Sequence, residues 1–474
     1  MPEPITPGSP DWYRNLLYKR LVEVQQPRAA FFSDYYIGDH PLPWLAPQAR
    51  DEFRRILAMT RSNYMGLVVD AMVERATVEG FRVGDDAEAD AADANTWRIW
   101  QANNLDADSD AGWLESAITG QSFFLVAPND ADASLPHVWV EHPSQCVVGY
   151  EPGTNRRGRR AGLKVWDDEW TGEVHATLYL LVDGLLWLFK YKAKRTGVTG
   201  HTAVTTWERR PVAGETWPAP GGMSVVPLVE NPNNPRLLTG GVSELYDVTD
   251  IQDRINKTLA DRLITQDYGA FPQKWISAWP DEDDDGNANT VDIGRNRAVT
   301  TEVAETKFGQ WESAPLDPYS MAKREDVKDI ASRTRTPAQY LLGEMSNVNG
   351  ETLKASESGL ISKVRQRQRP WGEAAEEAMR IARGLAGLSS PGETRMETIW
   401  SDPQYRTEGE RTDAALKRFQ GGVVPLRQTR EDLGYSQTVI DRMELADRDA
   451  AMDPVTAAIV DNVGRDADTA AFGA

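Results

Sequence analysis

The strongest structural signal in this chain is VPLVENPNNPRLLTGGVSELYDVTDIQDRINKTLADRLITQDYGAFPQKW, residues 226–275. A Pro/Asn/Gly-rich approach leads to Ser243, and the absence of Pro and Gly from there to Gly269 predicts one long helix over 243–269. Its apolar residues recur in steps of three and four, which predicts a packing stripe made of Leu245, Val248, Ile251, Ile255, Leu259 and Leu263. Charges of both signs cover the other faces, so we expect the helix to need neighbours along its length, as in a ring.

Length and composition indicate a large soluble protein. The chain has 474 residues, 40% of them apolar and 26% charged, enough for roughly two to four domains. No apolar run reaches the roughly 18 residues that a membrane-spanning helix needs. The first residues, MPEPITPGSPDWY, lack the basic and apolar blocks of a signal peptide. We therefore expect a protein that is made and used in a cytoplasm, without a membrane partner.

The formal net charge of −20 argues against ordinary nucleic-acid binding, which leaves a basic footprint on the binding surface. The charge is compatible with a protein past which DNA moves without sticking. It is equally compatible with a charged surface that only keeps the protein soluble.

The residues that usually carry chemistry form no recognisable pattern. The single cysteine, Cys146, excludes an intrachain disulfide and a cysteine-based metal cluster, and we interpret it as a small buried hydrophobe. The five histidines have no paired spacing, and the chain lacks a GxxxxGK[ST] phosphate loop, a GxGxxG turn after a strand and a GxSxG elbow. We predict no catalytic residue, no cofactor and no metal site.

The first half of the chain changes from a helical to a strand period. Helices are predicted over 8–29, 46–77, 96–101 and 112–119, with an aromatic connector at 31–45 and a strand at 80–83. From Gln121 the apolar period is two, and Asp183-Gly184 predicts a hairpin turn between two long strands. A basic loop between strands could contact phosphates, but we favour a solvated hairpin tip; its arginines are Arg156, Arg157, Arg159 and Arg160.

The second half begins with an irregular, strand-leaning segment at 270–316, which carries the acidic run Asp281, Glu282, Asp283, Asp284 and Asp285. Contiguous carboxylates on a turn cannot all face one ion, so we favour an exposed acidic tip over a metal loop. Asp317-Pro318 predicts the start of a returning helix that Thr336-Pro337 ends. A polar loop at 341–351 then precedes a helix that we expect Pro370 to kink or interrupt before it resumes to Arg383. A strand at 393–402, short helices over 408–449 and an Ala/Asp-rich tail complete the chain.

Four blocks in order carry a resemblance to a known family. They are YYIGDHPLPWL (35–45), NYMGLVVDAMVERATVEGFRV (63–83), PNNPRLLTGGVSELYDVTDIQDRINKTLADRLITQDYGAFPQKW (232–275) and TRTPAQYLLGEMSNVNGETLKASESGLISKVRQRQRPWGE (334–373). Their S-E-L, D-x-x-x-x-Q-D-x-x-N-K and aromatic-Pro-x-x-W patterns resemble the portal proteins of tailed bacteriophages, particularly the branch found in actinobacterial phages. The similarity weakens from about residue 405.

The resemblance implies an α+β portal fold. It implies a wing (1–240), a first stem helix (241–269), a clip (270–316), a second stem helix (317–336), a tunnel loop (337–350), a kinked wing helix with a wing strand (351–404), and an α-helical crown with the C-terminal tail (405–474).

It further implies a ring, typically of twelve copies, at one vertex of the capsid, with double-stranded DNA packaged and ejected through the axial channel. The implied partners are the large subunit of the terminase, a head-to-tail adaptor, the major capsid protein and a scaffolding protein. The implied location is the virion, with the host cytoplasm during assembly. Two other readings stay open: a DNA-processing phage enzyme, such as a nuclease or terminase subunit, and an unrelated oligomeric scaffold. The first would need a metal-binding carboxylate cluster and usually an ATP site.

Under the resemblance, the DNA-facing loop contains Ser346, Asn347, Asn349 and Gly350, with no cation before Lys354. Such a loop would touch the duplex without the tight phosphate contacts that act as friction; an ordinary exposed linker is the alternative. The acids at 281–285 would form the docking surface of the clip. We expect Arg333 and Arg335 to pair with acids of a neighbouring subunit rather than with DNA.

Overall fold

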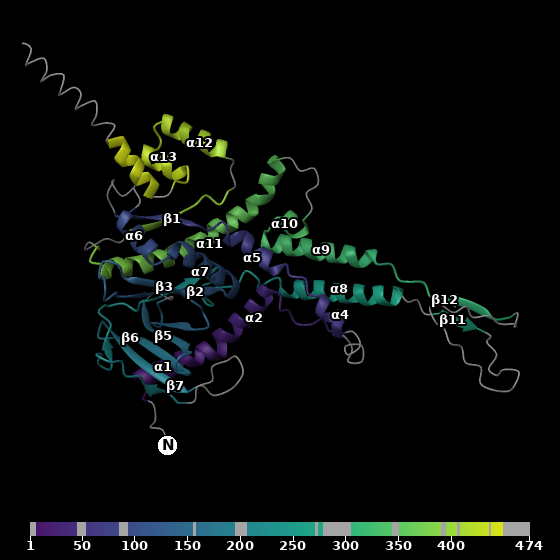
Figure 1. Cartoon of the computed structure of the whole chain (residues 1–474), viewed down its shortest axis with the longest axis horizontal. Coiled ribbons are helices and arrows are strands. Elements are labelled where there is room, and N and C mark those ends of the chain that lie inside the picture. Colours follow the sequence, from purple (N-terminus) through teal and green to yellow (C-terminus); the bar gives the residue numbers. More distant parts are fainter. Residues whose placement is uncertain are drawn as a thin grey trace, which may run out of the picture. The chain divides into compact units, whose positions relative to one another are not determined.

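The computed structural model describes residues 6–44, 54–84, 93–154, 158–194, 206–270, 274–277, 305–343, 350–389, 395–404, 408–435 and 438–448 (Figure 1). Its mixed helix and sheet content confirms the predicted α+β class. The chain divides into two compact units, which are described separately. The sheet unit comprises Met1–Tyr36, Leu67–Tyr246 and Asn347–Ala474, and the paired-helix unit comprises Ile37–Gly66 and Asp247–Ser346.

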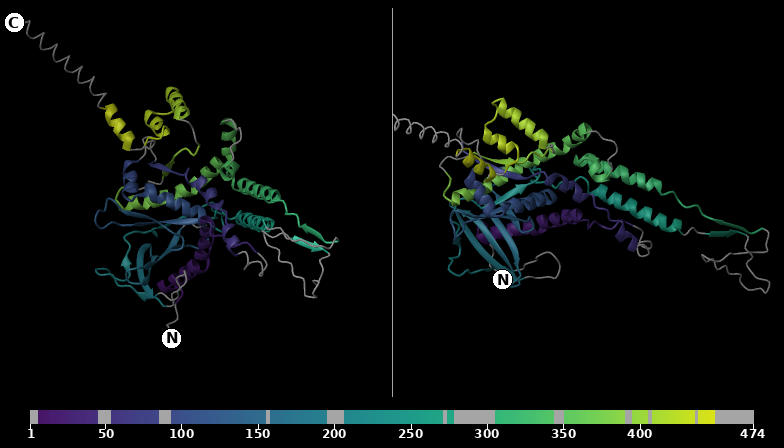
Figure 2. Two further views of the ribbon diagram at one scale, coloured as in Figure 1. Left: turned by 45° about the vertical axis from the view of Figure 1, so that its right-hand side comes forward. Right: turned by 45° about the horizontal axis from the view of Figure 1, so that its top comes forward.

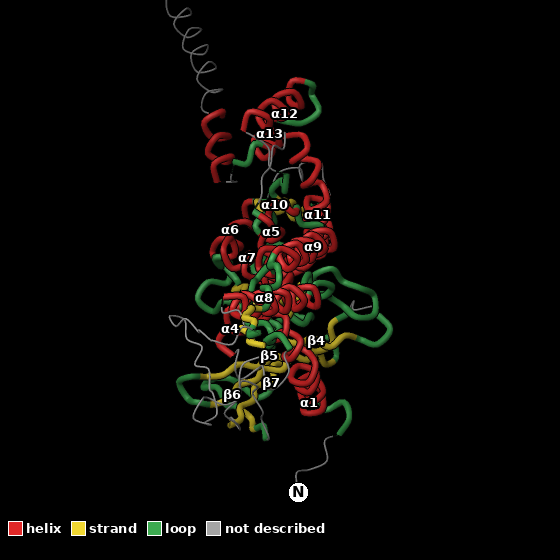
Figure 3. Tube along the Cα trace, turned by 90° about the vertical axis from the view of Figure 1, so that its right-hand side faces the viewer, coloured by secondary structure: helices red, strands yellow, loops and turns green. Residues whose placement is uncertain are grey.

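The largest sheet of the sheet unit is an antiparallel meander, with strand order β4-β5-β6-β7-β8 and β9 paired to β7. Its bounds are β4 Cys146–Tyr150, β5 Arg159–Asp168, β6 Glu173–Val182, β7 Leu185–Lys194, β8 Glu208–Arg209 and β9 Ala219–Pro220. Asp183 and Gly184 both have positive φ, so the predicted hairpin turn between β6 and β7 is confirmed. Leu17 and Leu21 pack against the buried face of this sheet, and Figure 3 shows α1 (Pro10–Arg20) beside its strands.

A second, three-stranded sheet joins β10 (Leu228–Pro232), β2 (Gln121–Ala127) and β3 (His137–Glu141). It packs against α7 (Leu105–Thr119) and the long α11 (Gly350–Leu385), while α6 (Ala94–Ala102) contacts α7. At the centre, the rings of Trp113 and Trp371 stack with centroids 5.5 Å apart, and Trp400 lies 5.5 Å from Trp113. Cys146 is fully buried, as predicted, and burial raises the pKa of its thiol.

A two-stranded ribbon, β1 (Val78–Val83) with β13 (Met396–Trp400), packs against α11. The C-terminal helices follow it: α12 (Glu408–Gln420), α13 (Leu426–Asp432) and a helical segment at 438–448. Ala415 and Ile440 of these helices are buried, whereas Leu416, Phe419 and Leu445 remain exposed.

The paired-helix unit is built on α8 (Thr249–Ala270) and α9 (Asp317–Thr334), which lie side by side in each view (Figures 1 and 2). Ile251, Ile255 and Ala260 of α8 are buried, as are Val327 and Ile330 of α9. The short helices α4 (Arg54–Met59) and α10 (Ala338–Leu342) pack on α8 and α9 respectively. The strands β11 (Lys274–Ser277) and β12 (Lys307–Gln310) pair as an antiparallel ribbon between α8 and α9 in the sequence.

Two predictions for the N-terminal helices are wrong in their boundaries. The helix predicted to end at residue 29 continues through the aromatic connector, as a π-helical turn (Leu21–Gln25) and then α2 (Gln26–Ile37). The single helix predicted over 46–77 is divided into α4 and α5 (Met65–Val73). The break occurs because Asn63 Oδ1 accepts the backbone N–H of Met65, which starts a new helix.

The helix predicted from Ser243 begins only at Thr249, so Leu245 and Val248 lie in the preceding turns, where both are buried. Ser243 Oγ accepts the N–H of Leu245, and the N–H of Glu244 bonds to the carbonyl of Ala117 instead of to a helical partner. The sequence predicts that Pro370 kinks or interrupts its helix; the interruption is wrong, because α11 is one helix of 36 residues, and the kink stays a prediction. Val364 and Trp371, on either side of the proline, are fully buried, and this packing outweighs the roughly 3 kcal/mol penalty of an internal proline.

Candidate functional site

The turn before α8 is held by a buried group of charges, here called the Glu244 cluster: Glu244, Lys363, Arg367 and Asn233. The Glu244 carboxylate lies 2.9 Å from Lys363 Nζ and 2.5 Å from Arg367 Nε. Asn233 Nδ2 donates to it at 2.8 Å. Lys363 and Arg367 are four residues apart on α11, so one face of the helix delivers both cations to the carboxylate.

Burial and charge act in opposite directions on Glu244, whose side chain is only 6% exposed. Burial alone would raise its pKa, but the two cations and the hydrogen bonds from Arg367 and Asn233 lower the pKa to about 2. Glu244 is therefore ionised in the folded protein at neutral pH. The cluster fixes the chain segment that leads into α8 firmly on α11, within the sheet unit.

The paired-helix unit has its own polar anchor on α8, here called the α8 clamp: Gln252 and Asn256. Both side chains are fully or almost fully buried. Asn256 Oδ1 accepts the backbone N–H of Ser62, and Gln252 Oε1 accepts that of Tyr64, each at 3.1 Å. Gln252 Nε2 donates to the Ser62 carbonyl and to Asn256 Oδ1.

The remaining donor of the clamp goes to a buried histidine. Asn256 Nδ2 lies 3.0 Å from Nδ1 of His40, so the amide group orients this ring as an acceptor at Nδ1. The clamp thus holds two separate segments, at residue 40 and at 62–64, on one face of α8. All of its contacts to these segments are directional, so the segments have one register on the helix.

The predicted packing stripe on α8 is partly a core and partly a surface. Ile251 and Ile255 are buried, whereas Leu259 and Leu263 are half-buried. Arg254 ties the outer face of α8 to α9 through Asp326 at 2.6 Å and Asp329 at 3.2 Å. Arg333 donates to the carbonyl of Asp247. Arg335 is the exposed residue that ends α9 in a left-handed conformation.

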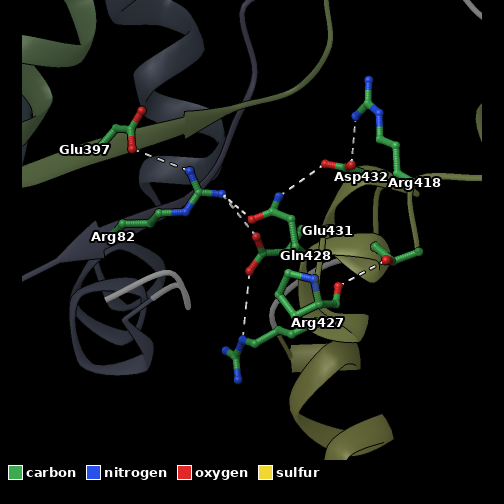
Figure 4. A network of polar contacts seen from close by, with 9 residues as sticks. Arg82, Glu397, Arg418, Arg427, Gln428, Glu431 and Asp432 are labelled. Carbon is green, nitrogen blue, oxygen red and sulfur yellow. Dashed lines mark hydrogen bonds and ion pairs between the residues drawn. The ribbon is translucent and has the colours of Figure 1, made fainter. Parts of the chain in front are cut away.

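The C-terminal helices meet the β1–β13 ribbon through the charged network of Figure 4. Arg82 of β1 lies 3.2 Å from Glu431 and 3.0 Å from Gln428, both on α13, and 3.4 Å from Glu397 of β13. The side chain of Glu431 is only 3% exposed, and Arg427 approaches it from its other side at 3.9 Å. A hollow of about 470 Å³ separates the ribbon from the helices beside this network. Arg82 therefore connects the β1–β13 ribbon to α13 through ion pairs and hydrogen bonds, beside a hollow; this polar contact is called the joint below.

Arg82→Gln is expected to loosen this joint without unfolding the sheet unit. The amide can still reach Gln428, but Glu431 loses one of its cations and regains water when the helices move away. Hydrogen exchange of the α13 amides should accelerate about tenfold, whereas the amides of β6 should keep their protection. Arg418→Gln is the matched control, because its pair with Asp432 lies within the C-terminal helices. Equal exchange in wild type and Arg82→Gln would contradict the joint.

Several predicted site residues lie outside the part of the chain that the structure describes. This holds for the acidic run Asp281, Glu282, Asp283, Asp284 and Asp285, and for the loop residues Ser346, Asn347 and Asn349. Gly350 is the first residue of α11. Among the described residues, no group of three or more His, Cys, Asp or Glu side chains could hold a metal ion. Nor does any described helix combine the length and apolar character needed to cross a membrane.

Sequence reasoning assigned no role to Glu244, Gln252 or Asn256. A usable signal was present for the last two, because they are uncharged polar residues four apart, interleaved with the apolar positions Ile251 and Ile255. Such residues on the buried face of a helix must find partners. For Glu244 the local sequence carries no sign of burial, since the two cations that pair with it are more than a hundred residues away on α11.

Comparison of the sequence with known proteins shows which protein family this chain belongs to. The family described as "Phage portal protein, SPP1 Gp6-like" matches residues 19–453. The chain is 32% identical over 442 residues to the portal protein of Mycobacterium phage L5, covering 88% of this chain and 85% of the relative. It is 31% identical over 411 residues to the portal protein of Mycobacterium phage D29, covering 82% and 79%. The chain belongs to the phage portal protein family, as the sequence resemblance predicts.

Proposed function

We propose that this chain assembles into the ring-shaped channel at one capsid vertex through which double-stranded DNA is packaged and ejected. The observation that carries the proposal is the family match across residues 19–453, which includes both units of the chain. We propose twelve copies in the ring. The terminase large subunit, a head-to-tail adaptor, the major capsid protein and a scaffolding protein are its proposed partners during assembly in the host cytoplasm.

The proposed subdomains follow the order of the elements. The pair α8 and α9 would form the stem, with the ribbon β11–β12 as part of the clip at 270–316. The sheets and α11 would form the wing, and α12, α13 and the segment at 438–448 would form the crown. The partly buried Leu259 and Leu263 support this assignment, because a stem helix that buries only part of its circumference leaves surface for neighbouring subunits. Arg333 and Arg335 would pair with acids of the adjacent subunit.

Negative-stain microscopy of the purified full-length protein tests the proposal. Rings with an axial hole are expected, and compact monomers or dimers at high protein concentration would contradict it. A nuclease assay with Mg²⁺ separates the proposal from the alternative of a DNA-processing enzyme. We propose a structural role without catalysis, so robust DNA cleavage by the pure protein would decide for the enzyme.

The predicted tunnel loop at 337–350, which begins with the short helix α10 (Ala338–Leu342), is proposed to contact the moving duplex with little friction. Asn347→Arg with Asn349→Arg is expected to slow packaging and lower the fraction of filled capsids, since each new phosphate contact must break as the DNA advances. Single-particle packaging velocity measures the effect, and it should be strongest at low salt. Asn347→Gln with Asn349→Gln is the control. Unchanged velocity in the arginine variant would refute the low-friction role of this loop.

A further inference from the structure

A tight turn after β10 presents two adjacent leucines to solvent. Arg236 and Gly240 exchange two backbone hydrogen bonds, of 2.9 and 3.1 Å, which close the turn. Leu237 and Leu238 at its tip are 87% and 98% exposed. Single exposed leucines are common on protein surfaces, but two in succession on a closed turn form a projecting apolar knob. We call Leu237 and Leu238 the leucine tip.

The leucine tip is held in place from both sides. Before the turn, Asn234 Oδ1 accepts a hydrogen bond from Arg367 Nη1 at 3.2 Å. After the turn, the Val242 carbonyl accepts one from Asn233 Nδ2 at 2.7 Å. Arg367 and Asn233 both belong to the buried Glu244 cluster, so the turn is attached to this buried group of charges. These bonds hold the backbone of the turn in the position that leaves both leucines exposed.

The surface beside the leucine tip has the composition of a protein interface. A hollow of about 890 Å³ borders the tip, with apolar lining from Leu181, Val225, Val226, Pro235, Leu237 and Ala374. Its lining also includes exposed charges of both signs, among them Arg236, Glu373 and Arg380. An apolar centre with a mixed polar rim is typical of contacts between proteins. A DNA surface would instead need a continuous positive charge.

We propose that the leucine tip is a contact between neighbouring subunits and is seated on a second copy of this chain. This inference rests on the proposed ring, in which every subunit has a copy of itself on each side and uses different patches toward the two neighbours. The rim of both signs suits the same occupant. A second copy carries Lys and Arg as well as Asp and Glu, so it can pair with Arg236, Arg380 and Glu373. The fixed tip then needs no reordering on assembly.

The double substitution Leu237→Ser with Leu238→Ser tests the contact in the full-length chain. Both side chains are exposed, so the circular dichroism and the midpoint of thermal unfolding of the dilute subunit should stay unchanged. Mass photometry should show that the protein concentration at which half of the subunits are in rings rises at least about tenfold. Trp170→Ser is the matched control, because Trp170 is also 98% exposed, between β5 and β6, and should leave assembly unchanged.

The outcomes separate this inference from the proposed function. Rings of the double variant that form at the wild-type concentration would overturn the contact while leaving the ring intact. Normal rings that fail to enter capsid shells would also overturn it, and would assign the tip to the capsid protein. Absence of rings in the wild type would overturn the proposed function, and this inference with it. A loss of assembly in the double variant, with Trp170→Ser assembling normally, supports the contact.

Discussion

Glu244→Gln is expected to lower the free energy of unfolding of the sheet unit by about 3–5 kcal/mol, the usual penalty for removing one partner of a buried ion pair. The substitution keeps the shape of the side chain but removes its charge. Lys363 and Arg367, whose side chains are 4% and 9% exposed, would then face each other without the anion that separates them. Urea unfolding of the dilute subunit, followed by the signal of the sheet strands, measures the loss.

The effect of the substitution should depend on pH in a defined direction. The pKa of Glu244 is lowered to about 2 in the folded protein, against an ordinary value near 4.5. A lowered pKa stabilises the fold above the ordinary value, and the contribution disappears as the pH falls toward the folded value. A shift of this size corresponds to about 3 kcal/mol. The stabilities of wild type and Glu244→Gln should therefore differ most above pH 5 and approach each other near pH 2.

Asp413→Asn is the control for this pair of measurements. Asp413 and Lys417 form an exposed ion pair one helical turn apart on α12, so its loss should change stability by less than about 0.5 kcal/mol. If Glu244→Gln and Asp413→Asn had equally small effects at pH 7, the Glu244 cluster would not stabilise the fold. If the large loss persisted unchanged at pH 2, its cause would be packing rather than charge.

The features predicted well from the sequence depend on neighbouring residues. Asp183-Gly184 specifies a hairpin wherever two apolar strands flank it, and the structure has that hairpin. The end of α8 is within one residue of the predicted Gly269, and α9 starts at the predicted Asp317. Both boundaries were predictable because a glycine favours the end of a helix and an Asp-Pro pair favours its start, whatever the rest of the fold. The α+β class follows from the same periodicities.

The features that were missed depend on residues far away in the chain. The helix predicted over 46–77 breaks at the local cap Asn63, but the flanking N–H groups of Ser62 and Tyr64 bond to the α8 clamp, almost two hundred residues later. The start of α8 is delayed because Glu244 is held by α11. The sequence around Ser62, Tyr64 and Glu244 contains no pattern that predicts these long-range bonds. The acidic run at 281–285 and the loop at 346–349 were chosen from composition and family resemblance, and they remain predictions.

Asn256→Leu should be the most disruptive single change in the paired-helix unit, with an expected loss of about 3–5 kcal/mol. Leucine has a similar size and a higher helix propensity, so neither a large cavity nor a weaker helix accounts for the loss. The substitution removes the acceptor for the Ser62 N–H and for Gln252 Nε2, and the donor to His40 Nδ1. A buried polar group that loses its partner costs about 1–3 kcal/mol.

Hydrogen exchange distinguishes this loss from general unfolding. In Asn256→Leu the amides of α8 and of the segment at 62–66 should lose protection together, because the clamp holds both, while the amides of β6 in the sheet unit keep theirs. Lys257→Gln, the next residue on the same helix, is the control. It removes a half-buried pair with Asp261 one helical turn away and should cost less than about 0.5 kcal/mol. If both variants exchanged alike, the clamp would be dispensable and the α8–α9 packing alone would hold the unit. If α8 alone lost protection, His40 and Ser62 would be positioned by contacts other than Asn256.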